Sequence, residues 1–362
     1  MRVRAVLCCA ILAVAVAGIA MARARDDDGA AAALAASTLR LGINANSIGW
    51  GDAVGGEQAL AAATGARWLR EELQWAAVVP RKGERHWARA DRMFASAAKR
   101  GLKVLPVLNE APRWAAGRDH ALPADARGYG AFVADAVARY GPQGSFWRAH
   151  PALDADLAPT YFELWNEPYF ARPAHGAVTA GRYAALAAVA IRSGATANPG
   201  ARFLVAVDPA TATEPELDAR WLDRLAAAQP SLLAGAAGVA THPYAADGAA
   251  SLRSLDRLRA VLAARTLPLP VWVTEIGWTT CSGAADCVTE RAQAADLRTF
   301  LNGVRRGDRA DAIFYYHLRS WRVRSGDQFY GDFGLLRANR SRKPAWTVFR
   351  LFANGLHRAG AP

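Results

Sequence analysis

The chain has 362 residues, 52% of them hydrophobic, so it can bury a sizeable core and does not have the composition of a disordered protein. Its formal net charge of +12 raises the question of a nucleic acid or an acidic polymer as partner. The arginines are scattered, with no block of five or six, and only four of the 44 basic residues are lysines, which indicates a composition bias rather than a nucleic-acid-binding surface.

The first element is an N-terminal signal peptide, predicted over residues 1–24. Arg2 and Arg4 form its positive region, an apolar stretch runs from Ala5 to about Ala20, and small residues with A-x-A spacing follow. A membrane anchor is the alternative, but the stretch is slightly short for a span of ~20 residues and is followed at once by acidic residues at 26–28. We therefore expect a secreted protein, extracellular or in the cell envelope, without stable membrane association after cleavage, and a short segment, 25–37, before the main domain.

Eight β-rich runs alternate with amphipathic, Ala-rich helical stretches through the rest of the chain. The predicted strands cover 39–44, 66–71, 103–109, 161–166, 202–207, 238–242, 271–275 and 312–318. The predicted helices cover 90–100, 126–140, 180–195, 215–228, 251–264, 289–304 and 344–356, and residues 141–160 read as a longer loop.

The strands are near-continuous apolar runs, as expected for strands covered on both faces. Strand and helix alternating eight times within one domain is the pattern of a (β/α)₈ TIM barrel, predicted here over residues 38–362. A doubly wound sheet is the alternative architecture. It needs a Gly-rich turn after the first strand, and "GINANSIGWGD" is not a convincing one.

Two cysteines remain after signal cleavage, Cys281 and Cys287, in "CSGAADC". In an exported protein, a pair this close predicts a disulfide that closes a short loop. A metal site is the alternative, but no further ligands have the usual spacing, so we expect no metal. Closing such a small loop contributes about 2 kcal/mol, and we expect its main role to be fixing the shape of the loop.

The segment "YFELWNEPYF" ends the fourth strand with Asn166 and Glu167, and "VWVTEIGWTT" ends the seventh with Glu275. The carboxyl ends of all barrel strands meet at one mouth, so the two glutamates are predicted to face each other. Two facing carboxylates are what glycoside hydrolysis requires. A separation of about 5–5.5 Å gives retention of configuration, and ~6.5–9.5 Å gives inversion.

Four neighbours are candidates for supporting this pair. Asn166 can donate a hydrogen bond to a sugar hydroxyl, and Arg70, at the end of the second strand, can keep a carboxylate ionised. His242 and Tyr244, in "THPYA", end the sixth strand, where a phenol can hold Glu275 in position. The structural alternatives are an ordinary ion pair of Arg70 with an adjacent glutamate and a histidine packed behind the barrel rim.

Aromatic side chains near the strand ends are candidates for stacking on sugar faces, namely Trp114, Trp278 and Trp321. The chain has 12 tryptophans, so most of them belong to the core or the rim. Glu110, after the third strand, is a further candidate for substrate contact.

The motifs "LWNEP" at 164–168 and "TEIGW" at 274–278 resemble the acid/base and nucleophile motifs of glycoside hydrolase clan A, the retaining (β/α)₈ enzymes. The likeness is to the family 39-like branch and more loosely to the cellulase-like family 5. It extends over nearly the whole mature chain. The resemblance implies that Glu167 is the acid/base, that Glu275 is the nucleophile, and that Asn166, Arg70, His242 and Tyr244 serve the cleavage subsite.

The chain also departs from these relatives. Ser320 stands where an Asp is expected, Tyr315 where a Trp is common, and Glu110 where an aromatic residue is common. These positions concern sugar-binding subsites, so they bear on the substrate more than on the mechanism.

The sequence therefore predicts a secreted retaining glycosidase, without a cofactor and monomeric, whose partner is a β-linked carbohydrate. A non-catalytic glycan-binding barrel and a transglycosylase are alternatives that no sequence feature separates from it. A metal-dependent hydrolase would need clusters of His and Asp at strand ends, and the seven histidines are dispersed.

Overall fold

The computed structural model describes residues 39–45, 53–117, 121–123, 125–169, 179–207, 217–282, 286–321 and 331–359. The predicted signal peptide (1–24) and the segment 25–37 lie outside the described residues.

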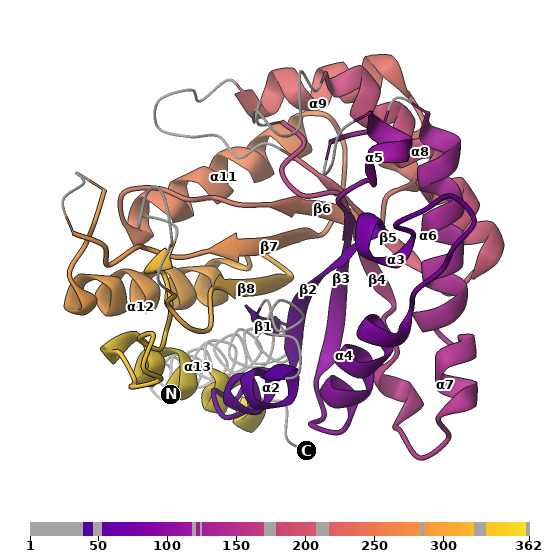
Figure 1. The fold of residues 1–362 in the computed structure, drawn as a ribbon. Helices are drawn as coiled ribbons and strands as arrows, with labels where there is room; N and C mark the ends of the chain where they lie inside the picture. Colours follow the sequence, from indigo (N-terminus) through magenta and orange to yellow (C-terminus); the bar gives the residue numbers. More distant parts are fainter. Residues whose placement is uncertain are drawn as a thin grey trace, which may run out of the picture.

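Eight parallel strands form a closed barrel in the order β1-β2-β3-β4-β5-β6-β7-β8, which confirms the predicted (β/α)₈ fold (Figure 1). All eight predicted strands are present, with ends shifted by at most a few residues. They are β1 (Arg40–Asn44), β2 (Trp68–Gln74), β3 (Lys103–Asn109), β4 (Tyr161–Leu164), β5 (Arg202–Ala206), β6 (Gly238–Thr241), β7 (Val271–Ile276) and β8 (Ala312–Tyr316).

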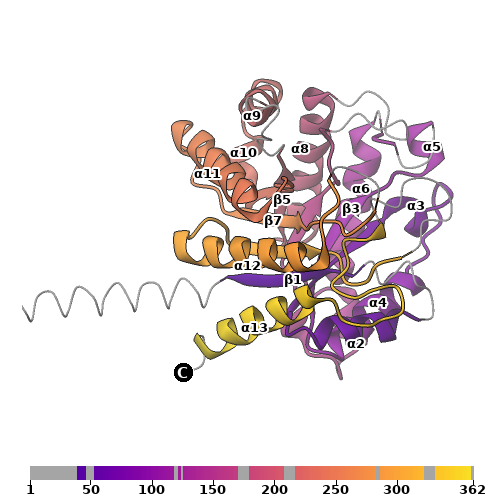
Figure 2. The same ribbon diagram turned by 90° about the vertical axis from the view of Figure 1, so that its left-hand side faces the viewer.

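Helices surround the barrel on the outside (Figures 1 and 2). The seven predicted helices correspond to α4 (Ala88–Ala98), α6 (Ala126–Tyr140), α8 (Ala180–Ala197), α9 (Leu217–Ala228), α11 (Gly248–Ala264), α12 (Glu290–Gly307) and α13 (Pro344–Ala359). Short elements that were not predicted are α2 (Val54–Ala62), α3 (Trp75–Val78), α5 (Arg113–Ala116), α7 (Ser145–Ala149), η2 (Ala155–Leu157) and α10 (Leu232–Gly235). Two of these, α7 and η2, interrupt the stretch that read as one loop.

Helix α12 illustrates how sequence sets these boundaries. The Thr289 side chain accepts a hydrogen bond from the backbone N–H of Ala292 and caps the first turn. Leu297, Leu301 and Val304 recur at helical spacing and are buried against the barrel. The helix ends where Asp308 adopts a left-handed conformation. Among the described residues, no helix combines the length and the apolarity needed to cross a bilayer.

The barrel interior holds two kinds of layer. Near the amino ends of the strands the layer is apolar, and it consists of Leu105, Leu204, Ala240, Trp272, Ala312 and Phe314, with Trp68 and Tyr161 packed against them. The Phe314 ring fills the space over Gly42, where a Cβ would lie 2.4 Å from the ring. Towards the carboxyl ends the inward-facing side chains become polar, and these form the candidate site.

Candidate active site

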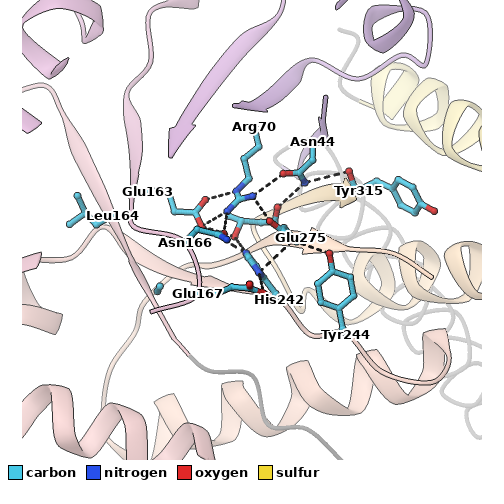
Figure 3. A network of polar contacts seen from close by, with 12 residues as sticks. Asn44, Arg70, Glu163, Leu164, Asn166, Glu167, His242, Tyr244, Glu275 and Tyr315 are labelled. Atoms are coloured by element: carbon cyan, nitrogen blue, oxygen red, sulfur yellow. Dashed lines mark hydrogen bonds and ion pairs between the residues drawn. The ribbon is translucent and has the colours of Figure 1, made fainter. Parts of the chain in front are cut away.

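The turn after β4 directs two successive polar side chains into the barrel mouth. Trp165 and Glu167 both have positive φ angles, 68° and 44°, which non-glycine residues adopt only at a cost of about 1 kcal/mol each. The surroundings hold Trp165 in place: its backbone N–H donates to the Leu108 carbonyl at 3.1 Å, and its buried ring contacts Tyr129. As a result, Asn166 and Glu167 both face the centre of the site (Figure 3).

A bulge in β7 has a similar effect on the opposite side. The register with β8 shifts between Val273 and Ile276. Side chains in a regular strand alternate between faces, but the shift lets the neighbours Thr274 and Glu275 both reach the polar network.

Arg70 lies at the centre of this network and is 5% exposed (Figure 3). Each of its five N–H donors has an acceptor, so the fork is fully satisfied. The bonds run from Nε to Glu163 Oε2 (2.7 Å), from Nη2 to Glu163 Oε1 (2.9 Å) and Asn166 Oδ1 (2.7 Å), and from Nη1 to Asn44 Oδ1 (2.9 Å) and Glu275 Oε1 (2.5 Å).

Two ion pairs keep the Arg70 guanidinium charged. Burial alone lowers the pKa of Arg70, but the charges of Glu163 and Glu275 outweigh it and raise that pKa above its ordinary value. Arg70 lies on β2, Glu163 on β4 and Glu275 on β7, so the two ion pairs connect three different strands and fix the geometry of the site.

Glu275 is held as a carboxylate. Besides Arg70, it accepts a hydrogen bond from the Tyr244 hydroxyl at 2.9 Å, and His242 Nδ1 lies 3.7 Å from its Oε2. Burial raises the pKa of Glu275, but His242, Arg70 and Tyr244 together lower it below its ordinary value of 4.5. Burial and the adjacent Glu275 charge raise the pKa of Tyr244, so its hydroxyl stays protonated and donates.

A chain of hydrogen bonds links His242 to both glutamates of the fourth strand region. The Thr274 hydroxyl donates to Glu163 Oε1 at 3.2 Å, because an ionised carboxylate only accepts. His242 Nε2, 3.1 Å from the same hydroxyl oxygen, therefore carries a proton and donates. The other ring nitrogen, Nδ1, lies 3.0 Å from Glu167 Oε1, so His242 and Glu167 share one proton between them.

Two glutamates stand near Glu275, and their environments differ. Glu163 is 1% exposed and uses both oxygens to bind Arg70, so Glu163 and Glu275 form a buried carboxylate pair across one arginine. Glu167 lies at the strand end. One oxygen of Glu167, one of Glu275 and one ring nitrogen of His242 all lie within 4.8 Å of one another, so the two carboxyl groups face the same small space.

A small cavity of about 90 Å³ opens beside Glu275. Trp321 forms one wall, stacked on His317 at a centroid distance of 4.1 Å. Asn44 and Glu72 line the cavity as well, and sequence reasoning did not select them. Their positions carried a signal: Asn44 ends the first strand, and Glu72 follows Arg70 by two residues, which places it on the same face of β2.

The other predicted aromatic contacts lie farther from this cavity. Trp114 is 40% exposed, packs edge-on against Trp75 and donates from Nε1 to the Val79 carbonyl. Trp278 is buried and donates to the Ala245 carbonyl. Neither lines the cavity beside Glu275, so their contacts with substrate stay predictions.

The three departures from the resembling families have different surroundings. Tyr315 points away from the network, and its hydroxyl donates to the Phe333 carbonyl at 2.9 Å (Figure 3). Ser320 accepts a hydrogen bond from Lys343 Nζ at 3.1 Å and is buried. Glu110 follows β3 with a φ of 61°.

Among the described residues, one group of His and acidic side chains is close enough together to hold a metal ion, namely Glu167, His242 and Glu275. Their donor atoms are already engaged, since Glu275 binds Arg70 and Tyr244, and His242 binds Thr274 and Glu167. A divalent cation would also lie beside the Arg70 charge. These contacts favour an organic acid–base site over a metal centre.

The Cys281–Cys287 disulfide is present, with the two Cα atoms 5.1 Å apart. It lies in the segment that follows β7, close to the strand end that carries Glu275.

Comparison with known proteins finds similar structures but no similar curated sequences. The chain matches no protein-family model and no curated protein sequence. It is similar in structure to a family 39 glycoside hydrolase from Bacteroides cellulosilyticus WH2 (TM-score 0.62, 22% identity, 88% of this chain and 64% of that one). Other similar structures are GH5_18 from Streptomyces cattleya in complex with GlcNAc (TM-score 0.67, 18% identity, 90% and 81%) and xylanase 10B from Thermotoga maritima (TM-score 0.61, 12% identity, 89% and 97%).

These neighbours belong to glycoside hydrolase families 39, 5 and 10, which are (β/α)₈ enzymes of clan A, so the resemblance seen in the two motifs is confirmed at the level of the fold. The chain spans 64% of the length of the family 39 enzyme. At these identities the likeness concerns the fold, and the chemistry of the chain is argued from its own residues.

Proposed function

We propose that the chain is an exported retaining glycoside hydrolase that cleaves a β-linked saccharide by double displacement, with Glu275 as nucleophile and Glu167 as acid/base. The observation that carries this proposal is the environment of Glu275. Arg70, His242 and Tyr244 keep it ionised beside a second carboxyl group within 4.8 Å.

In the first step, a Glu275 oxygen attacks the anomeric carbon. The glycosidic C–O bond breaks as Glu167 gives its proton to the leaving oxygen, and a covalent glycosyl ester forms on Glu275. In the second step, Glu167, now a carboxylate, takes a proton from water. The resulting nucleophile attacks the anomeric carbon and releases the Glu275 carboxylate.

The surrounding residues support these steps in ways that the contacts suggest. His242 Nδ1 faces Glu167 Oε1 and shares the proton that Glu167 gives to the leaving oxygen in the first step. Arg70 can only donate hydrogen bonds, so it turns the Oδ1 atom of Asn166 towards itself. The amide N–H groups of Asn166 then remain as donors for a sugar hydroxyl. Trp321 offers an aromatic face beside the cavity.

Two buried carboxylates compete for the acid/base role, and their hydrogen-bond partners decide between them. Glu163 is 1% exposed and is bound on both oxygens by Arg70 and Thr274. A proton placed there would break the charge pairing of Arg70. Glu167, at the end of the strand, can present a proton to the mouth, so we assign the role to Glu167 and treat Glu163 as the residue that positions Arg70.

The test is turnover by the purified mature protein on aryl β-glycosides and β-linked glucans, xylans, mannans and galactans, with Glu275→Gln alongside. A 2-deoxy-2-fluoro glycoside of the sugar that is cleaved should label Glu275, located by peptide mass spectrometry. Labelling of another residue, or full turnover by Glu275→Gln, would overturn the assignment. Products longer than the substrate would identify transfer to sugar rather than to water, and binding without turnover would favour a glycan-binding barrel.

Export is part of the same proposal and rests on the N-terminal sequence together with the disulfide. N-terminal sequencing of the protein recovered from the culture medium or envelope fraction should give a start near residue 25. Recovery of uncleaved protein from the membrane fraction would contradict it.

A further inference from the structure

A second cavity, of about 330 Å³, lies close to the cavity beside Glu275. Residues that follow β6, β7 and β8 form it, so it belongs to the same mouth of the barrel. Its walls include Tyr244, Ala245, Trp278, Asp286, Val288 and Phe333.

A cluster of three aromatic rings joins the linings of the two cavities. Tyr316 lines the cavity beside Glu275, Phe333 lines the second one, and Tyr244 contacts both rings. The centroid distances are 6.3 Å for Tyr244–Tyr316, 5.8 Å for Tyr244–Phe333 and 5.5 Å for Tyr316–Phe333. Since the Tyr244 hydroxyl also binds Glu275, a ligand in the second cavity touches a residue that holds the proposed nucleophile.

The chemistry of the walls fits a sugar ring. Aromatic and aliphatic side chains supply apolar contact for its C–H faces, and the exposed Asp286 carboxylate supplies an acceptor for its hydroxyls. The indole N–H of Trp278 donates a hydrogen bond to the Ala245 carbonyl, which fixes the ring. The backbone carbonyl of Trp278 accepts a hydrogen bond from Gln293 Nε2 at 2.8 Å. The cavity is therefore built from side chains with a set orientation.

The disulfide restrains the acidic edge of this cavity. Asp286 directly precedes Cys287, which is bonded to Cys281. On the other side, the Val288 N–H donates to the Thr279 carbonyl at 2.9 Å and returns the chain to the end of β7. These two links hold Asp286 at the rim.

We propose that this second cavity is a saccharide subsite, which binds a neighbouring sugar residue of the chain that is cleaved at Glu275. Asp286 accepts hydrogen bonds from its hydroxyls, and Tyr244 is shared by the two subsites. The proposal rests on the proposed function, and it makes the substrate an oligo- or polysaccharide rather than a glycoside of a single sugar.

The experiment compares substrates of increasing length. For the sugar series that the wild type cleaves, kcat/KM is measured on linear β-linked oligosaccharides from disaccharide to hexasaccharide and on the aryl monoglycoside. Two variants address the cavity: Asp286→Ala removes the acceptor, and Ala246→Trp places a bulky ring at the exposed edge of the cavity. Ser282→Ala, an exposed change in the same disulfide loop and outside both cavities, is the matched control.

We expect kcat/KM on the longer oligosaccharides to fall about tenfold or more in both cavity variants, the loss of about 1.4 kcal/mol of binding. The aryl monoglycoside and the Ser282→Ala control should stay close to wild type. An unchanged dependence on chain length in both variants would overturn the subsite while leaving the proposed function standing.

A binding measurement keeps the two proposals apart. Calorimetric titration of Glu275→Gln with the same oligosaccharides reports affinity without turnover. Weaker binding on adding Ala246→Trp supports the subsite even if no substrate is cleaved. Equal binding with and without Ala246→Trp, or no binding of any oligosaccharide, would overturn it.

Discussion

At the scale of single residues, the site separates two buried glutamates four residues apart into different tasks. Glu163 is bound on both oxygens, and Glu167 faces His242 at the strand end. The sequence pointed to Glu167 through "WNEP" but gave no reason to select Glu163, since an inward-facing strand glutamate cannot be told from a loop glutamate without knowing its partner Arg70.

The variants Glu167→Gln and Glu163→Gln should therefore behave differently. Glu167→Gln removes the proposed proton donor, so turnover of substrates with poor leaving groups should fall by ~10²–10⁴-fold, while aryl glycosides with acidic phenols should be much less affected. Glu163→Gln should lower turnover of both kinds of substrate alike and also lower the melting temperature, because it leaves part of the buried Arg70 charge uncompensated. Steady-state kinetics over a series of leaving groups measures the first effect, and thermal unfolding of both variants measures the second. A leaving-group dependence confined to Glu163→Gln would reverse the assignment.

Tyr244→Phe tests how Glu275 is kept ionised. The hydroxyl lowers the pKa of Glu275, so its loss should raise that pKa. In the proposed mechanism activity requires the Glu275 carboxylate and declines as the pH falls through its pKa, so the acid limb of the kcat/KM profile should move to higher pH. Turnover at the optimum should fall about tenfold or more, the usual cost of losing a hydrogen bond to a charged group. An acid limb that stays in place, or moves to lower pH, would contradict this role.

At the scale of elements, the strands were predictable and their irregularities were not. Barrel strands are covered on both faces, so both alternating sets of side chains are mostly apolar and each strand appears in the sequence as a continuous apolar run. The bulge in β7 and the positive φ angles of Trp165 and Glu167 depend on contacts with other strands, which no local pattern encodes. These irregularities aim the site residues. Sequence could therefore place Glu167 and Glu275 at the mouth but could not give their mutual geometry.

Helix α2 shows the opposite limit. Gly55 and Gly56 lie in its first turn and weaken helix propensity by roughly 1 kcal/mol each, so the segment did not read as helical. Tertiary contacts compensate, since the fully buried Glu57 forms an ion pair with Arg319 at 2.9 Å and Gln58 donates to the Met93 carbonyl.

Lys343 connects three segments at the mouth and makes the loops sensitive to pH. Its Nζ donates to Thr280, Ser320 and the Asp332 carbonyl, and burial lowers its pKa from 10.5 to about 8. Between these two values the unfolded chain binds the proton more tightly than the folded one, so folding becomes more favourable as the pH rises.

The free energy of unfolding of wild type, minus that of Lys343→Met, should therefore be flat below about pH 8 and rise towards pH 10.5. Urea unfolding at a series of pH values measures it. The same difference taken with Lys99→Met, at an exposed position, serves as the control. A difference that falls with rising pH would show that Lys343 is stabilised in its charged form.

At the scale of the whole molecule, the barrel interior has an apolar layer near the amino ends of the strands, which contributes to stability, and a polar layer near the carboxyl ends, which forms the candidate site. Phe314→Ala, in the apolar layer, should cost about 3–5 kcal/mol of unfolding free energy, because it opens a cavity over Gly42. The turnover of each folded molecule should stay near wild type, measured by titrating active sites with a slow covalent inhibitor. Leu351→Ala, at a side chain that is 66% exposed, should change stability by less than about 0.5 kcal/mol. Loss of turnover without loss of stability in Phe314→Ala would contradict this division.

The two-layered interior has a consequence for how such a protein can diversify. Substitutions in the apolar layer near the amino ends of the strands can accumulate, or be repaired by neighbours, without touching Arg70 and its partners at the other end. The residues that surround the mouth come from separate connections after β6, β7 and β8, each of which can lengthen or change alone. Proteins that share this barrel can therefore acquire different substrates while they keep the same arrangement around Arg70. Their sequences can diverge until little similarity remains.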